Sequence, residues 1–132
     1  MGKPEREFPD VTGLPWTAVV GSATAGAGGA GIEEKVLSRD PLTGDVTRLF
    51  RFAPGVRTPD TIAHDFWEEV FILEGSVVDL GLDQTFTAGM YACRPPGMKH
   101  GPYASPGGAL LFETRYYCND GAATGSKRGW AV

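Results

Sequence analysis

Short runs of β-branched and aromatic residues, each closed by glycine or proline, are the feature of this sequence that most restricts its fold. The 132 residues include 19 glycines and 10 prolines, and these separate the apolar runs instead of forming low-complexity tracts. No stretch has a convincing amphipathic helical pattern. The pattern predicts an all-β sandwich or barrel, with strands at residues 46–52, 69–73, 77–82, 84–87, 90–93 and 109–117.

The strong strand signals divide the chain into three segments. Residues 46–118 are predicted to form the barrel core. Residues 1–45 are expected to be an N-terminal arm with one or two strands and a glycine-rich loop at 21–31, packed on the barrel. Residues 119–132 are expected to be a loose tail. Within strand 46–52 the alternation is imperfect, because Arg48 shares a face with Val46, Phe50 and Phe52.

Length and charge narrow the function classes. A chain of 132 residues is long enough for one domain. Its net charge of −4 argues against nucleic acid as a partner, and its apolar runs are too short to span a membrane. The N-terminus lacks a secretory pattern, and two cysteines make no disulfide framework. A cytoplasmic protein is expected, with Cys93 as a small buried hydrophobe.

The two histidines stand where metal chemistry can be built. On a strand, residues four apart share a face, so His64 and Glu68 are expected to point into one cavity while Glu69 points outward. A strand pair could bring His100 to them. Two imidazoles and one carboxylate form a facial triad typical of non-haem Fe(II), although Zn, Mn, Ni and Co are alternatives.

Two sequence motifs resemble those of the cupin superfamily. His64, Glu68 and Gly75 fit the spacing of the first cupin motif, and Gly55 lies one residue from its opening position. The second motif, G-x5-P-x-G-x2-H, is matched at every position by Gly89, Pro95, Gly97 and His100. The two motifs are most similar to those of small cupins that resemble acetylacetone dioxygenase, and to those of the cupin domain of zinc-binding anti-sigma factors.

This resemblance implies a single-domain double-stranded β-helix, the jelly-roll barrel of cupins. It also implies one divalent metal ion per chain, with Fe(II) favoured, and a homodimer that pairs through the N-terminal arms. A small-molecule substrate is expected. Nucleic acid and membrane are not expected as partners.

One family ligand is missing, because Ile62 stands where the first histidine of the usual His-x-His pair would be. Three interpretations follow. His64, Glu68 and His100 hold the metal alone, as catalytic sites with three protein ligands do. Alternatively, Asp60 replaces the missing ligand, or the site no longer holds metal.

Arg94 is the predicted catalytic and substrate-binding residue. The resemblance places its position in the metal cavity, where a guanidinium could clamp a carboxylate, phenolate or enolate. The alternative is a rim arginine paired with Asp79 or Asp83. Apolar walls for a small ligand could come from the following side chains, which could equally be core: Phe66, Trp67, Tyr91, Met98 and Phe112.

Three functions are therefore kept. The first is an Fe(II) dioxygenase that cleaves a diketone, hydroxyketone or phenolic compound. The second is a non-redox metal enzyme (an isomerase, lyase, cyclase or hydrolase) in which the metal polarises a carbonyl. The third is a non-catalytic module that binds a small ligand or senses a metal, as in the anti-sigma relatives. Fold alone cannot choose among them.

Overall fold

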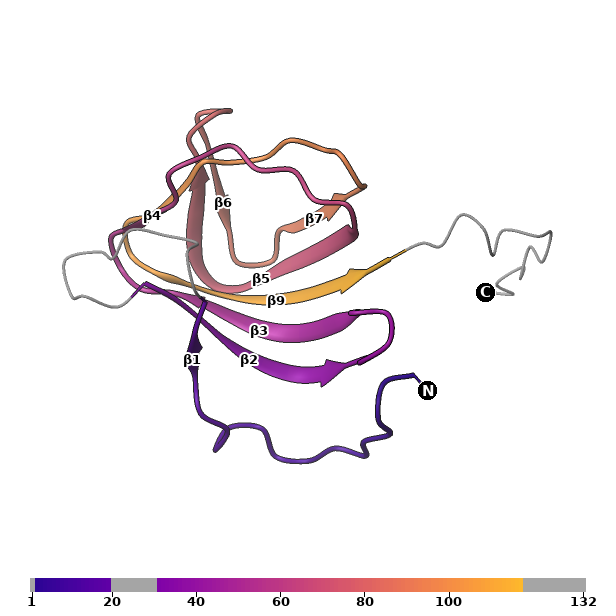
Figure 1. The fold of residues 1–132 in the computed structure, drawn as a ribbon. Helices are drawn as coiled ribbons and strands as arrows, with labels where there is room; N and C mark the ends of the chain where they lie inside the picture. Colours follow the sequence, from indigo (N-terminus) through magenta and orange to yellow (C-terminus); the bar gives the residue numbers. More distant parts are fainter. Residues whose placement is uncertain (1, 20–30, 118–132) are drawn as a thin grey trace.

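Antiparallel strands that curl around a common interior make up the whole described architecture (Figure 1). The computed structural model describes residues 2–19 and 31–117. These residues form nine strands and no helix, so none of them belongs to a helix that could cross a membrane. The prediction of an all-β, single-domain barrel is confirmed.

Two sheets share one strand. In the first sheet the order is β1 (Thr17–Ala18), β2 (Ile32–Arg39), β3 (Val46–Phe52), β9 (Ala109–Tyr116), β5 (Trp67–Asp79) and β7 (Tyr91–Arg94). In the second sheet it is β6 (Gln84–Thr87), β5, β8 (Tyr103–Ser105) and β4 (Val56–Arg57). The first half of β5 pairs in the first sheet and its second half in the second.

The continuity of β5 corrects the sequence prediction of separate strands at 69–73 and 77–82. The chain does not turn at Glu74 and Gly75. It passes through an irregularity between Ile72 and Glu74 and continues to Asp79. Gly75 has φ of +77°, and a Cβ added there would lie 2.1 Å from the Gly108 carbonyl oxygen. A glycine is therefore required at this bend, because the backbone of Gly108 and Ala109, where β9 begins, lies too close for a side chain.

Alternation along the strands separates a barrel interior from an outer surface. In β3, Val46, Arg48, Phe50 and Phe52 are all buried, while the residues between them are partly exposed. The apolar core lies beside them and consists of Ile32, Phe50, Phe52, Val56, Val70, Ile72, Val77, Tyr103, Ala109 and Leu111. The imperfect alternation at Arg48 is therefore real, because this arginine lies inside the barrel.

β1 and β2 lie in the N-terminal arm, where one or two strands were expected without stated positions, and β4 and β8 were not predicted. β2 carries Glu33, Glu34 and Lys35 in its middle, which hides its pairing with β3 along most of its length. β8 is three residues long and follows a glycine and a proline. The glycine-rich loop lies outside the described residues except for Gly31, and so does the expected tail at 119–132.

The bend at Gly75 can be tested against a glycine with similar backbone geometry but open surroundings. Gly89 has φ of +91° and no atom within 4 Å of an added Cβ. We expect Gly89→Ala to lower the free energy of unfolding by about 1–2 kcal/mol, the cost of a left-handed conformation. Gly75→Ala adds a backbone clash and should cost more than about 3 kcal/mol. Urea unfolding measures both, and equal losses would show that β9 does not constrain this bend.

Candidate metal centre

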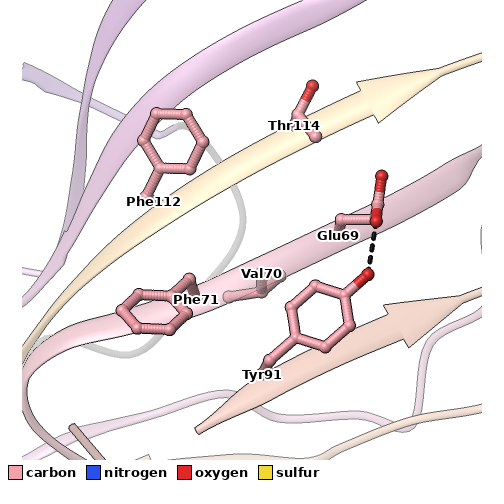
Figure 2. Close-up of a pocket in the computed structure, with 6 residues that line it drawn as sticks. All are labelled: Glu69, Val70, Phe71, Tyr91, Phe112 and Thr114. Carbon is pink, nitrogen blue, oxygen red and sulfur yellow. Dashed lines mark hydrogen bonds between the residues drawn. The ribbon is translucent and has the colours of Figure 1, made fainter. Parts of the chain in front are cut away.

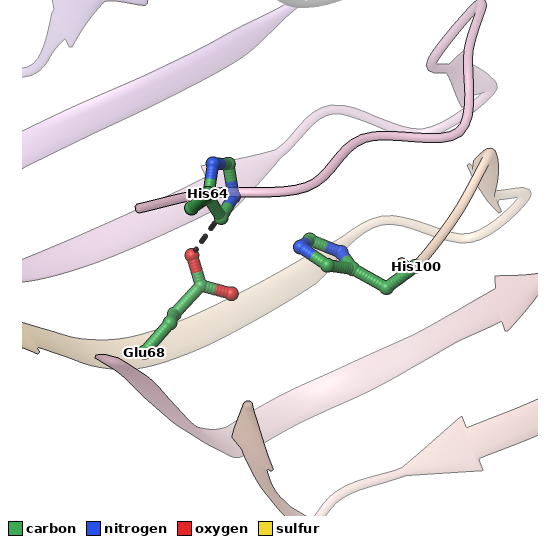
Figure 3. Close-up of side chains that lie close together, drawn as sticks. All are labelled: His64, Glu68 and His100. Carbon is green, nitrogen blue, oxygen red and sulfur yellow. Dashed lines mark ion pairs between the residues drawn. The ribbon is translucent and has the colours of Figure 1, made fainter. Parts of the chain in front are cut away.

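Three side chains converge inside one end of the barrel: His64, Glu68 and His100 (Figure 3). One ligand-type atom of each lies within 4.8 Å of the others. Within the described residues, this is the group of histidine, cysteine and acidic side chains that could hold a metal ion. The three residues predicted as ligands are thus brought together.

Backbone hydrogen bonds place the three residues. Glu68 is on β5, opposite Arg94 of β7 and Arg115 of β9. His64 precedes β5 in a loop, and its carbonyl oxygen accepts a bond of 2.8 Å from the Gly97 amide. His100 exchanges two backbone hydrogen bonds with Ile62, of 2.8 and 2.9 Å.

The His64 side is where the cluster meets solvent. His64 Nε2 lies 3.5 Å from Glu68 Oε2, and the two side chains are 26% and 6% exposed. The His64 ring stacks on Phe66 with centroids 4.4 Å apart. Burial lowers the pKa of His64, with the nearby Glu68 carboxylate acting in the opposite direction. A neutral imidazole at neutral pH is the form that binds metals.

The two ring nitrogens of His100 have different surroundings. Nδ1 lies 2.8 Å from the Tyr103 hydroxyl, whereas Nε2 is buried without a hydrogen-bond partner among the described residues. Burial, and after it the charge of Arg94, lowers the pKa of His100 to about 4. The ring is therefore neutral at pH 7. A buried polar nitrogen without a partner is costly, and a metal ion would satisfy it.

Arg94 is bound on both sides by protein groups. Its Nη1 donates to Glu68 Oε1, and its Nη2 donates to the Tyr103 hydroxyl at 2.8 Å. The expected alternative, a rim arginine paired with Asp79 or Asp83, is not what these bonds show. Asp79 instead accepts the backbone amides of a turn. Arg94 is thus joined directly to one candidate ligand and through Tyr103 to another.

A second charged group lies on the same inner surface. Arg48 donates two bonds to Glu113 Oε1, at 3.0 and 2.8 Å, and also pairs with Glu34. Arg115 donates to the same Glu113 oxygen at 3.1 Å, and its guanidinium lies 4.5 Å from the Phe66 ring centroid. Burial raises the pKa of Glu113, and the neighbouring Glu68 carboxylate adds to that effect.

The donor set fits a divalent metal ion. Two imidazoles and one carboxylate make a facial set. The buried Nε2 of His100 has no hydrogen-bond partner among the described residues, and a metal ion would provide one. Asp60, considered as a replacement for the missing histidine, does not belong to the group. The arrangement corresponds to the interpretation with three protein ligands.

The structure corrects the expected apolar walls. Tyr91 and Phe112 pair with Phe71 across the strands, so they lie on the outer face of the first sheet, opposite Glu68. There they line an open groove of about 280 Å³ (Figure 2), together with Glu69, Val70, Phe71 and Thr114.

Other expected residues also lie away from the three candidate ligands. Trp67 alternates with inward-facing Glu68 and stacks on Tyr116. Met98 is an exposed turn residue. Glu69 faces outward, as expected, and accepts a hydrogen bond from Tyr91. Cys93 is an exposed free thiol, which corrects its expected burial. Phe66 is the expected aromatic residue that does contact the cluster, through His64.

Sequence reasoning missed four interior residues: Arg48 and Glu113 as a buried pair, Arg115, and Tyr103. A signal existed for Arg48, which stands at an apolar position of its strand, and for Glu113 and Arg115, which share the face of Leu111 in β9. Nothing in the sequence indicates Tyr103, because its role depends on how the loop after His100 folds.

Comparison with known proteins identifies the family to which this fold belongs. The profile of the ChrR cupin-like domain family matches residues 10–117. The chain belongs to this family of cupins. The resemblance expected from the two motifs is thereby confirmed.

Solved structures show the same fold at low sequence identity. An RmlC-like cupin from Shewanella frigidimarina has a TM-score of 0.65 at 20% identity, over 92% of this chain and 98% of that chain. An acetylacetone dioxygenase from Acinetobacter johnsonii has a TM-score of 0.67 at 18% identity, over 89% of this chain and 81% of that chain. A chain in the complex of SigE with the anti-sigma ChrR from Rhodobacter sphaeroides has a TM-score of 0.57 at 19% identity, over 80% of this chain and 51% of that chain. No functionally curated sequence matches the chain.

The low pKa of His100 gives a pH dependence of stability. Its folded-state pKa is about 4, below the value of about 6.5 for an unfolded chain. The unfolded state therefore binds a proton first, and the metal-free protein should lose stability as pH falls from about 6.5 to about 4.

Urea unfolding at pH 7 and pH 4.5 measures this loss. His100→Gln removes the titrating ring, so the variant should lose less stability over the same interval, by roughly 1–3 kcal/mol. Identical losses in the wild type and the variant would show that His100 is not the group responsible.

Proposed function

We propose that this cupin is a metal-dependent enzyme that acts on a small organic molecule, and specifically an Fe(II) dioxygenase. The observation that carries the proposal is the convergence of two imidazoles and a carboxylate around an unpartnered buried nitrogen, His100 Nε2. His64, Glu68 and His100 would hold the metal. A set of three protein ligands leaves coordination positions open for substrate and oxygen.

The bound metal would polarise a substrate oxygen, and iron would add the capacity for oxygen chemistry. The protein supplies the surroundings. Phe66 covers one face of the His64 ring, and the ring of the core residue Tyr103 lies 5.7 Å from that of His100; both limit the access of water to the cluster. His64 is the most exposed of the three candidate ligands, so substrate would approach from its side.

The substrate class follows from the charges. Three arginines pair with three glutamates inside the barrel: Arg48, Arg94 and Arg115 with Glu34, Glu68 and Glu113. Buried Asp79 adds one carboxylate near His100, and both histidines are neutral at pH 7. A divalent ion would leave this interior positively charged. An anionic oxygen ligand, such as the enolate of a diketone or hydroxyketone or a phenolate, would compensate that charge. Arg94 remains the predicted clamp, since its guanidinium has five N–H groups and Glu68 and Tyr103 accept two of them.

The metal site can be tested with two neighbouring glutamates. Glu68→Gln replaces a candidate ligand, whereas Glu69→Gln alters the outward-facing residue beside it on the same strand. We expect about one metal ion per chain in the wild type and in Glu69→Gln, and less than about a tenth of that in Glu68→Gln. Elemental analysis of untagged protein measures the content. Equal metal in both variants would place the ion elsewhere.

The type of chemistry is read from the same preparations. Iron in the wild type, together with oxygen consumption in the presence of a β-diketone or catechol, would support the dioxygenase. Stoichiometric zinc with no oxygen consumption would favour the non-redox isomerase, lyase, cyclase or hydrolase. A wild type that holds no metal even after reconstitution would leave the non-catalytic ligand-binding or metal-sensing module.

Ile62 offers a gain-of-function test. Its backbone pairs with that of His100 in an antiparallel bridge, and side chains of such pairs lie on the same face. Ile62 is 41% exposed, so an imidazole can replace it without disturbing the core. We expect Ile62→His to tighten metal binding by at least about tenfold, measured by competition with a chelator. Ile62→Gln, similar in size but a poor ligand, is the control and should bind as the wild type does.

A small-molecule substrate and a homodimer remain predictions for this chain. Sedimentation equilibrium would measure the oligomeric state, and a monomer at micromolar concentration would contradict the expected dimer.

A further inference from the structure

The proposed metal site uses Nε2 of His100, whereas Nδ1 of the same ring contacts Tyr103. Tyr103 is buried on β8, and its hydroxyl lies 2.8 Å from His100 Nδ1. A histidine ring can coordinate a metal through either nitrogen, and the bond made by the other nitrogen decides which one is used. In His100 the Tyr103 hydroxyl is the partner of Nδ1, so Nε2 is the nitrogen that remains available to a metal ion.

The Tyr103 hydroxyl is itself fixed in place. Arg94 Nη2 donates to it at 2.8 Å, and the Tyr103 amide donates to Thr58 Oγ1 at 2.7 Å. Burial raises the pKa of Tyr103 to about 12, so the phenol is neutral at pH 7. A phenol oxygen can accept more than one hydrogen bond. It can therefore hold the Arg94 N–H and an Nδ1–H of His100 together.

Arg94 extends this bond to a second candidate ligand. Its Nη1 donates to Glu68 Oε1, while Glu68 Oε2 faces His64. One guanidinium thus links the Glu68 carboxylate to the Tyr103 hydroxyl, and through it to the His100 ring. The side chains of two of the three candidate ligands are held by this single chain of bonds.

We propose that Tyr103, anchored by Arg94, is the positioning residue of the metal centre: its hydroxyl accepts Nδ1–H of His100 and directs Nε2 to the metal. The inference rests on the proposed metal site and adds how that site is oriented. Tyr103 contacts neither metal nor substrate. Its contribution is to hold the ring hydrogen on Nδ1, which leaves the Nε2 lone pair free, and to prevent rotation of the ring.

Removal of one hydroxyl tests the proposal. Tyr103→Phe deletes the acceptor and keeps the buried ring. We expect the dissociation constant for Co(II), measured by competition with a chelator, to rise by about 10- to 100-fold, the usual effect of losing the hydrogen-bond partner of a metal-binding histidine. The visible spectrum of bound Co(II) should change as well, because His100 would no longer be held in one orientation.

Tyr91→Phe is the matched control. The Tyr91 hydroxyl also has a polar partner, but it donates to the Glu69 carboxylate on the outer face of the sheet. Its removal should change the Co(II) dissociation constant by less than about twofold. An effect of Tyr91→Phe as large as that of Tyr103→Phe would overturn the proposal, since any loss of a tyrosine hydroxyl would then suffice.

A double-mutant comparison separates positioning from general stability. If Tyr103 acts through His100, Tyr103→Phe should change residual Co(II) binding by less than about twofold in a His100→Ala background. An effect of the same size in both backgrounds would overturn the proposal. Circular dichroism and urea unfolding of each variant establish that the compared proteins are folded.

A measurement on the wild type keeps the proposal falsifiable even if Tyr103→Phe does not fold. In the zinc-loaded protein, 15N chemical shifts should show His100 bound through Nε2 with its hydrogen on Nδ1. Binding through Nδ1 would overturn the positioning role and leave the metal site intact. Failure of the wild type to bind Co(II) or Zn(II) would overturn the proposed function and this inference together.

Discussion

The structure depends on a single strand, β5, that is hydrogen-bonded in both sheets. Its first half lies between β9 and β7, and its second half between β6 and β8. Because the strand bends instead of ending, the inner surface of one sheet is brought over the other. Glu68 lies on the first half, whereas Tyr103 lies on β8, which pairs with the second half, and His100 lies shortly before β8. The bend at Gly75 therefore determines that these residues face one another.

Burial of charge is the second constraint on this interior. Glu68 and Glu113 have side chains that are 6% and 5% exposed. A buried carboxylate whose partner is removed costs about 3–5 kcal/mol, so each carboxylate needs the arginine beside it. Glu68 has Arg94, and Glu113 has Arg48 and Arg115. The polar end of the barrel is thus built from paired charges, to which a bound divalent cation would add positive charge.

The sequence was most informative where strand signals and spacing act locally. The limits of β3 and β6 and the outward direction of Glu69 follow from alternation alone, and the two motifs indicated the cupin fold. Tyr91 and Phe112 were misplaced because their direction depends on the register of β7 and β9 against β5, which alternation within one strand does not give. The position of β2 within the arm was not predicted because its charged residues hide the alternation: Glu34 pairs with Arg48, and Lys35 is buried against the carbonyls of Val11 and Thr12.

Tyr103 shows a different limit. It lies three residues after His100, where no periodic pattern links the two side chains. Its contact with Nδ1 depends on the backbone path from Gly101 to β8 and on Arg94, which arrives from another strand. Such a partner is found only when the loop geometry is known. The ligand residues themselves were found because the motif spacing carries them.

The backbone bonds between Ile62 and His100, and between Gly97 and His64, join the two histidine-bearing loops into one seam. Glu68 stands across from this seam on a central strand. An ion held by all three residues would therefore cross-link loop to sheet, and its escape would require the seam to separate first. The lifetime of the bound ion would then be set by local opening of these loops. Slow amide hydrogen exchange at residues 62, 97 and 100 would be its signature.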